Sequence, residues 1–211
     1  MSPAKGGVAF NLFAYLLAGL AAMFLLFLAG NAMIDLHREA RHRTLARYHT
    51  VRNTLFPFVA GKVMLTVVML LLCSAIMFGG GALLFRIRWP SPFALLSLDL
   101  GYACFAAGLL ALLVALVPEE RHAGVLNTLA GMALGLAGGC AFPPQQLPPL
   151  LRDHLSPLLP TYWFAESLRA LGSGGAGVPW VQVSLKLAGA GLILTALAAW
   201  RFRKRFKGGL P

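Results

Sequence analysis

Residues 56–85 have the sequence FPFVAGKVMLTVVMLLLCSAIMFGGGALLF, and their single charged side chain is Lys62, close to the start of the stretch. A helix crosses the roughly 30 Å hydrocarbon core of a membrane with about 20 apolar residues. Because backbone groups in lipid must form hydrogen bonds within their own segment, such a run is expected to be helical. This stretch therefore predicts a transmembrane helix.

Four further runs of the same kind lie along the chain, at residues 8–30, 93–117, 125–142 and 181–200. The apolar part of the first run is longer than that of a signal peptide, so we expect it to stay as a span. The alternating ten-residue pattern of a membrane barrel is absent from the sequence. The sequence predicts an all-α integral membrane protein in which residues 1–211 form one bundle of about five transmembrane helices.

Composition excludes a soluble domain. Hydrophobic residues make up 58% of the chain and charged residues only 12%, with a net charge of +11. Soluble domains are about 45–50% apolar and roughly a quarter charged. A basic chain can also indicate nucleic acid as a partner. Here the bases lie in short stretches between apolar runs, as is typical of membrane topology. We therefore expect a lipid bilayer and no nucleic acid as the partner.

Two basic stretches predict the topology of the chain. One lies between the first two runs and the other follows the last run. Their bases are Arg38, Arg41, Arg43, Arg47 and Arg52, then Arg201, Arg203, Lys204, Arg205 and Lys207. With five spans, both stretches lie on the same side of the membrane. The positive-inside rule then places the C-terminus in the cytoplasm and the N-terminus outside.

The first basic stretch, residues 34–53, contains neither Pro nor Gly. Its sequence, IDLHREARHRTLARYHTVRN, is too polar to span a membrane, and it suits a helix lying along the membrane face. Two interpretations remain open for this segment. It is either a basic anchor for anionic headgroups or a docking element for a cytoplasmic protein.

Glycine and proline mark the region around the fourth run. Gly131, Gly135 and Gly139 recur every four residues, a spacing that allows close contact between helices in lipid. They serve either packing within one chain or a dimer face or moving pathway wall. An outer segment, residues 143–180, follows, and the stretch 142–160 is rich in proline and cannot be one helix. We predict a broken re-entrant or interfacial element there, on the outer side.

Asp99 and Lys186 are isolated charges inside predicted spans, which makes them a candidate intramembrane polar site. Both lie near the outer ends of their runs. Asp99 is either in contact with water or part of a substrate or proton pathway, and Lys186 is expected to extend to the interface. The two side chains could also pair with each other. Glu166 and Arg169, three residues apart, favour a local salt bridge.

Three stretches of the sequence together resemble the C-terminal membrane half of a type-2 ABC transporter permease. Residues 11–27 resemble the second transmembrane helix of that family. The stretch REARHRTL at residues 38–45, followed by Gly61 and Lys62, is similar to the family's coupling segment. The third stretch comprises FPPQQLP at residues 142–148, LPTYW at residues 159–163, and Leu168 with Arg169. These motifs precede the last helix of the family.

The resemblance implies the membrane subunit of an ATP-driven exporter, located in the bacterial inner membrane. It implies a substrate path through the bundle, a separate ATPase subunit as partner, and a homodimer or a second permease chain. No G-x-x-x-x-G-K-S/T loop occurs in the sequence, so we expect no cofactor on this chain and ATP on the partner. The implied ATPase contacts are Arg38, Glu39, Arg41 and Thr44, and the implied outer gate is Phe142, Pro143 and Pro148.

Two alternatives remain. Members of the family usually begin with a further transmembrane helix and an extracytoplasmic domain, which leaves open a truncated or split permease without transport activity of its own. An intramembrane enzyme would need paired acids or clusters of histidine and acid at membrane depth. Only Asp99 meets that requirement, so the enzyme interpretation is the weaker one.

Overall fold

A computed structural model of the chain describes residues 12–41, 56–85, 89, 91–117, 119–141, 149, 151–173 and 179–207. Every regular element in these ranges is a helix, and they contain no strand. The prediction of an all-α fold is confirmed for this part of the chain.

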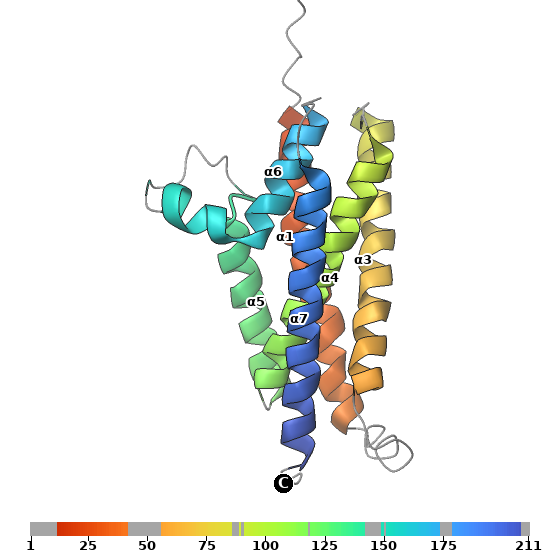
Figure 1. Ribbon diagram of the computed structural model, residues 1–211, viewed down its shortest axis with the longest axis vertical. Helices are drawn as coiled ribbons and strands as arrows, with labels where there is room; N and C mark the ends of the chain where they lie inside the picture. The colour runs from red at the N-terminus through yellow and green to blue at the C-terminus, as the bar shows by residue number, and fades with distance from the viewer. Residues whose placement is uncertain are drawn as a thin grey trace, which may run out of the picture.

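Long helices form the body of the bundle, and shorter ones pack along one side of it (Figure 1). The long helices are α1 (Leu12–Arg41), α3 (Phe56–Phe85), α4 (Pro92–Leu116) and α7 (Trp180–Lys207). The shorter elements are α5 (Glu120–Ala137), a π-turn η2 (Leu151–Leu155), a 3₁₀ turn η3 (Ser156–Leu158) and α6 (Pro160–Gly172). Within the described ranges, four segments are long and apolar enough to cross a membrane: Tyr15–Asp35, Pro57–Leu84, Pro92–Leu116 and Trp180–Lys204.

The fourth predicted span, at residues 125–142, requires correction. Its helix is α5, which begins at Glu120 and ends at Ala137, and it is not among the four helices with spanning character. The first turn of α5 is polar, and Gly139, with φ 67°, ends the helical path early. The chain therefore returns across the bundle in two pieces, the shorter helix α5 and, after the break, α6 (Figure 1).

Two other predicted boundaries also move. Helix α1 continues without interruption past the predicted end of the first span to Arg41, so the beginning of the 34–53 segment belongs to the same helix. The predicted outer segment, residues 143–180, contains α6, which packs against α1, α4 and α7. Phe164, Ala165 and Leu168 of α6 are fully buried. This part of the segment is thus a component of the bundle.

Helix α4 lies at the centre of the bundle and packs against α1, α3, α5, α6 and α7. Ser91 caps its N-terminus by accepting a hydrogen bond from Ala94 N at 3.2 Å, and the helix itself begins at Pro92. The Tyr102 ring stacks on Phe164 of α6, with ring centroids 4.0 Å apart. Its hydroxyl donates to Ala22 O of α1 at 2.8 Å. One buried tyrosine therefore joins three helices.

Helices α4 and α7 run in the same direction and approach each other at glycines. A Cβ on Gly101 would lie 2.7 Å from Ser184 O, closer than real Cβ atoms come to backbone. Seven residues further along both helices, Gly108 and Gly191 meet backbone to backbone, with even less room for a side chain. A seven-residue repeat keeps two helices in register along their length.

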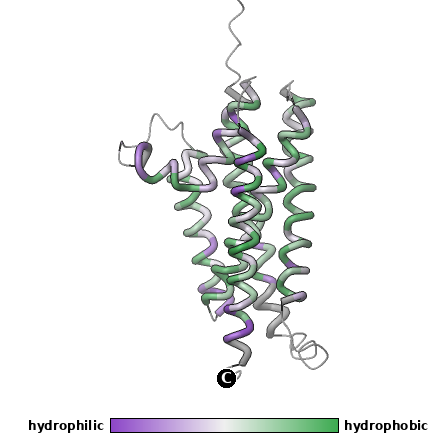
Figure 2. Tube along the Cα trace, viewed as in Figure 1, coloured by the Kyte–Doolittle hydropathy of each residue, from purple (hydrophilic) through white to green (hydrophobic). Residues whose placement is uncertain are grey.

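The outward faces of the bundle are apolar. Met64, Ile76 and Leu83 of α3 and Leu185 and Leu192 of α7 are all more than 60% exposed. Hydrophobic residues run along most of the length of the helices (Figure 2). A soluble monomer rarely exposes apolar surface on this scale, whereas the hydrocarbon of a bilayer covers it without cost.

We predict that Gly191→Ala destabilises the bundle and that Gly189→Ala does not. A methyl group on Gly191 would collide with the Cys104 backbone, whereas a Cβ on Gly189 meets nothing within 4 Å. Alanine improves helix propensity equally at both sites, so the difference between them isolates the collision. We expect a loss of about 1–3 kcal/mol for Gly191→Ala, measured by thermal unfolding in detergent. Equal unfolding midpoints for the two variants would contradict the close α4–α7 contact.

Candidate functional site

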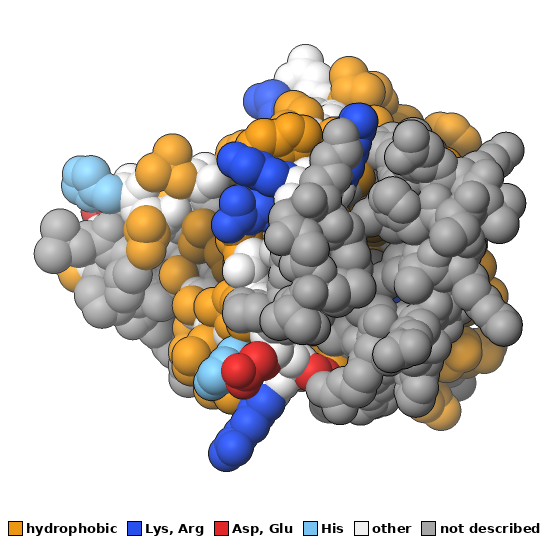
Figure 3. All heavy atoms as spheres, turned by 90° about the horizontal axis from the view of Figure 1, so that it is seen from below, with side chains coloured by type: hydrophobic (Ala, Val, Ile, Leu, Met, Phe, Trp, Pro, Cys, Tyr) orange, Lys and Arg blue, Asp and Glu red, His pale blue; other side chains and the backbone are white. Residues whose placement is uncertain are grey.

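The end of the bundle that carries the C-terminus is basic, and Figure 3 shows Lys and Arg side chains gathered on this face. Arg201, Arg203 and Lys204 of α7 are exposed there, as is Arg121 of α5. The acidic side chain of Asp35, on α1, lies at the same end and forms an ion pair with Lys62 of α3, 3.8 Å apart. This ion pair links α1 to α3, the helices that precede and follow residues 42–55 in the sequence.

The predicted ATPase contacts belong to the continuation of α1 and the residues after it. Arg38, Glu39 and Arg41 lie in the last turns of α1, where the structure describes the backbone path and not the side chains. Thr44 lies outside the described residues. The described side chains of the segment are those of Ile34 and Asp35, and Ile34 lies 3.7 Å from the Cβ position of Gly124 on α5.

One face of α1 packs along the whole of α5, and the two helices run in opposite directions. A Cβ on Gly131 would lie 3.2 Å from the Phe27 ring, and a Cβ on Gly135 would lie 3.2 Å from Met23. Gly131 and Gly135 therefore face α1 of the same chain, in agreement with the interpretation that they serve packing within one chain. A role of this face in pairing between chains stays a prediction.

A polar contact lies in the middle of the α1–α5 face. Asn127 of α5 is 4% exposed, and its Nδ2 donates to Gly30 O of α1 at 3.2 Å. A side-chain amide that bonds across two helices in lipid stabilises their register. Asn127 was not singled out by the sequence, although a lone amide inside an apolar run is a recognisable signal.

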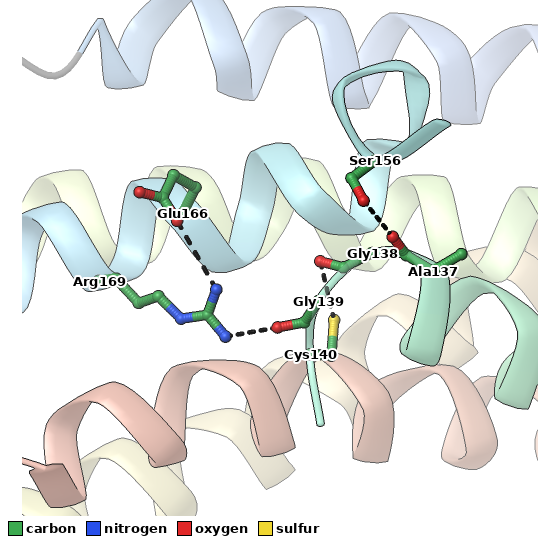
Figure 4. A network of polar contacts seen from close by, with 7 residues as sticks. All are labelled: Ala137, Gly138, Gly139, Cys140, Ser156, Glu166 and Arg169. Carbon is green, nitrogen blue, oxygen red and sulfur yellow. Dashed lines mark hydrogen bonds and ion pairs between the residues drawn. The ribbon is translucent and has the colours of Figure 1, made fainter. Parts of the chain in front are cut away.

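The C-terminal end of α5 is capped by side chains from the segment that follows it (Figure 4). Ser156 of η3 donates to Ala137 O at 2.6 Å, and Thr161 of α6 donates to Leu134 O at 3.0 Å. The last carbonyls of a helix have no partner inside the helix. In lipid they also lack water, so these side chains make the break after α5 energetically acceptable.

Arg169 of α6 completes this cap. Its Nη2 donates to Gly139 O at 2.7 Å, and its Nη1 lies 3.6 Å from Glu166 Oε2 (Figure 4). The expected local pair with Glu166 is present, but it is only part of the arrangement. The Arg169 side chain is 5% exposed, and its guanidinium carbon lies 4.3 Å from the centre of the Tyr15 ring of α1. A cation at this position also complements the negative end of the α5 dipole.

The predicted gate residues Phe142, Pro143 and Pro148 lie outside the described residues, between α5 and η2. Gly139 is among the described residues, but it lies beyond the end of α5, whereas Gly131 and Gly135 lie within that helix. Its carbonyl receives the Arg169 hydrogen bond, and its positive φ belongs to the turn that ends α5.

Asp99 and Lys186 do not meet in the structure. Asp99 is 3% exposed and is bonded to the buried Ser74 hydroxyl of α3, which also lies 2.9 Å from Leu71 O. The second carboxyl oxygen, Oδ1, has no hydrogen-bond partner. Lys186 is exposed on α7, with its Nζ 5.9 Å from the centre of the Trp163 ring. Asp99 thus joins α3 to α4, and Lys186 lies at the surface of the bundle.

The length and apolar character of these helices define a multi-pass membrane protein. A comparison with protein families matches residues 4–171 to the ABC-2 type transporter domain. The chain belongs to this family and is a transporter permease subunit. A search of curated proteins found no match. The matched region includes α1, α3, α4, α5 and nearly all of α6, so it covers the basic end of α1 and the capped break after α5.

We predict that Asp99 and Ser74 are coupled in stability. Ser74→Ala removes the hydroxyl and leaves the buried Asp99 carboxyl unsatisfied, which we expect to cost about 1–3 kcal/mol. The double variant Ser74→Ala/Asp99→Leu removes both polar groups and should recover much of this loss. A double-mutant cycle from unfolding midpoints in detergent measures the coupling. Additive effects of the two single changes would show that the pair contributes no interaction of its own.

Proposed function

We propose that this permease subunit is the membrane-spanning part of an ATP-driven exporter, and that residues 34–53 dock a separate ATPase subunit. Membership of the ABC-2 family supports the proposal. The observation that carries it is the continuity of α1, which extends from the outer end of the bundle into this basic segment as one helix, Leu12–Arg41.

Continuity matters because it supplies a mechanical path. At 1.5 Å per residue, α1 is about 45 Å long, more than the thickness of the hydrocarbon core. A force applied near Arg41 therefore reaches the far end of the bundle through one rigid element. Closure of the ATPase on nucleotide would supply that force, and the substrate would cross along the bundle.

Charge supports docking at this end. Arg38, Glu39, Arg41 and Thr44 are the proposed contacts, and charged groups of this kind steer association and fix its register. ATP is bound and hydrolysed on the partner, because this chain has no phosphate-binding loop of the Walker type. A second permease chain, identical or not, would complete the assembly.

The basic end also supports an orientation. Exposed Arg201, Arg203 and Lys204 lie at the same end as the continuation of α1. Under the positive-inside rule this end faces the cytoplasm of a bacterial inner membrane, and the N-terminus lies outside.

We predict that the triple change Arg38→Ala/Glu39→Ala/Arg41→Ala lowers the amount of co-purified ATPase on the order of tenfold, since each lost charged contact weakens the complex. The measurement is a detergent pull-down after co-expression with candidate ATPase subunits. The matched control is Arg201→Ala/Arg203→Ala/Lys204→Ala, which removes charges from the same face on a different helix and should retain binding. Absence of any ATPase from the pull-down of the native chain would contradict the proposed function and leave a remnant without transport activity.

We also predict that the two ends of the bundle face opposite sides of the membrane. In a background free of Cys73, Cys104 and Cys140, the single changes Arg203→Cys and Ser173→Cys each create an exposed reporter, one at each end of the bundle. An impermeant maleimide applied to intact spheroplasts should label Ser173→Cys, and it should label Arg203→Cys only after the membrane is opened. The reverse pattern would overturn the orientation.

A further inference from the structure

The further inference concerns the place where α1, the break after α5, and α6 meet. A single buried arginine, Arg169, contacts all three elements, through Tyr15 of α1, Gly139 after α5 and its own helix. We infer that Arg169 is a positioning residue that fastens the broken α5–α6 segment to the outer end of α1, so that the two move together. We name Tyr15, Gly19, Gly139, Cys140 and Arg169 the clasp.

Space for the clasp comes from Gly19. Any side chain at this position would collide with the Cys140 carbonyl, and its Cβ would lie 3.0 Å from Arg169 Nη2. The chain after α5 therefore touches the α1 backbone directly. Tyr15 lies one helical turn earlier on the same face of α1 and provides the ring over which the guanidinium lies. The contact thus combines backbone proximity, a charged hydrogen bond and a cation–π contact.

The chemistry of the clasp requires arginine. A planar guanidinium can stack on a ring with its face and donate hydrogen bonds from its edge at the same time. The ammonium group of lysine is a compact, strongly hydrated point charge without a planar face, so it fits this pair of contacts less well. Because the Arg169 side chain is buried, its charge is stable only while its partners are in place.

The clasp lies at one end of the longer contact between α1 and α5. The face of α1 that carries Tyr15 and Gly19 continues through Met23 and Phe27 to Ile34, and from Met23 onward it packs on α5. A displacement of α1 at its basic end is therefore passed to α5 along their shared face, and to the segment around η2 and α6 through Arg169. This transmitting role rests on the proposed function, whereas the clasp itself does not.

The native thiol of Cys140 reports on the clasp. Cys140 is 2% exposed, and with Cys73→Ala and Cys104→Ala it becomes the single cysteine of the chain. In bilayer nanodiscs, Arg169→Gln should raise the rate of labelling by an impermeant maleimide about tenfold, since a buried charge-assisted contact is lost. Arg169→Lys retains the charge and should raise the rate less. Lys186→Gln removes an exposed cation near Trp163 and should leave the rate unchanged.

A native labelling rate in Arg169→Gln would overturn the clasp. Where Arg169→Gln fails to fold, as judged by size-exclusion chromatography, Tyr15→Leu carries the same test. It removes the ring and leaves the hydrogen bond, so it should give an intermediate rate. A native labelling rate in Tyr15→Leu would contradict the contribution of the Tyr15 ring, and with it the attachment of Arg169 to α1.

A second arm tests transmission in the complex with the ATPase. Addition of nucleotide should change the Cys140 labelling rate in the native permease and leave it unchanged in Arg169→Gln, although the ATPase still co-purifies. A nucleotide response that persists in Arg169→Gln would overturn the transmitting role. Failure of any ATPase to bind the native chain would instead overturn the proposed function, and the nanodisc arm would still decide the clasp.

Discussion

Contact between helix backbones at glycine is the interaction on which this bundle depends. In lipid, apolar side chains gain nothing by leaving hydrocarbon for other hydrocarbon, so helices associate through close packing and polar contacts. Gly108 and Gly191 bring the backbones of α4 and α7 together, and Gly131 and Gly135 of α5 make room for the Phe27 and Met23 side chains of α1. These two pairs then meet through Tyr102, which reaches from α4 to α1 and stacks on α6.

A second constraint follows from the absence of water in the membrane. Helix α5 ends inside the fold, and the carbonyls of its last turn need partners that a soluble protein would find in solvent. Ser156 and Thr161 bond carbonyls of that turn, and Arg169 bonds the Gly139 carbonyl just after it, all from sequence positions about twenty to thirty residues further along. Because a break of this kind holds its shape only while its caps are in place, the chain carries a polar cluster in its otherwise apolar region.

The sequence predicts which segments are helices better than it predicts how those helices pack against one another. Long apolar runs identify α1, α3, α4 and α7, because the thickness of a bilayer fixes the length of a span. The limits of α5 were wrong because hydropathy does not register the turn at Gly139. The burial of Arg169 was missed because its partners, Tyr15 and Gly139, are distant in sequence. Asp99 and Lys186 were considered as a pair from their similar depth, but depth does not determine which way a helix is rotated.

The way each helix is held indicates which parts of the bundle can move independently. Helices α1 and α5 share a face on which Gly131 and Gly135 receive the Phe27 and Met23 side chains, and the chain after α5 meets α1 at Gly19, so sliding one helix past the other would break contacts along the whole face. Helix α3 is held differently. Its Gly61, Gly79 and Gly80 face open space, and its joints to the bundle include the Lys62–Asp35 ion pair and the Ser74–Asp99 contact. Contacts between single side chains can re-form after a small shift, whereas a closely packed face along two helices cannot shift without repacking. A displacement of α1 that starts at its basic end would therefore move α5 and α6 as well, and these three helices would shift relative to α3.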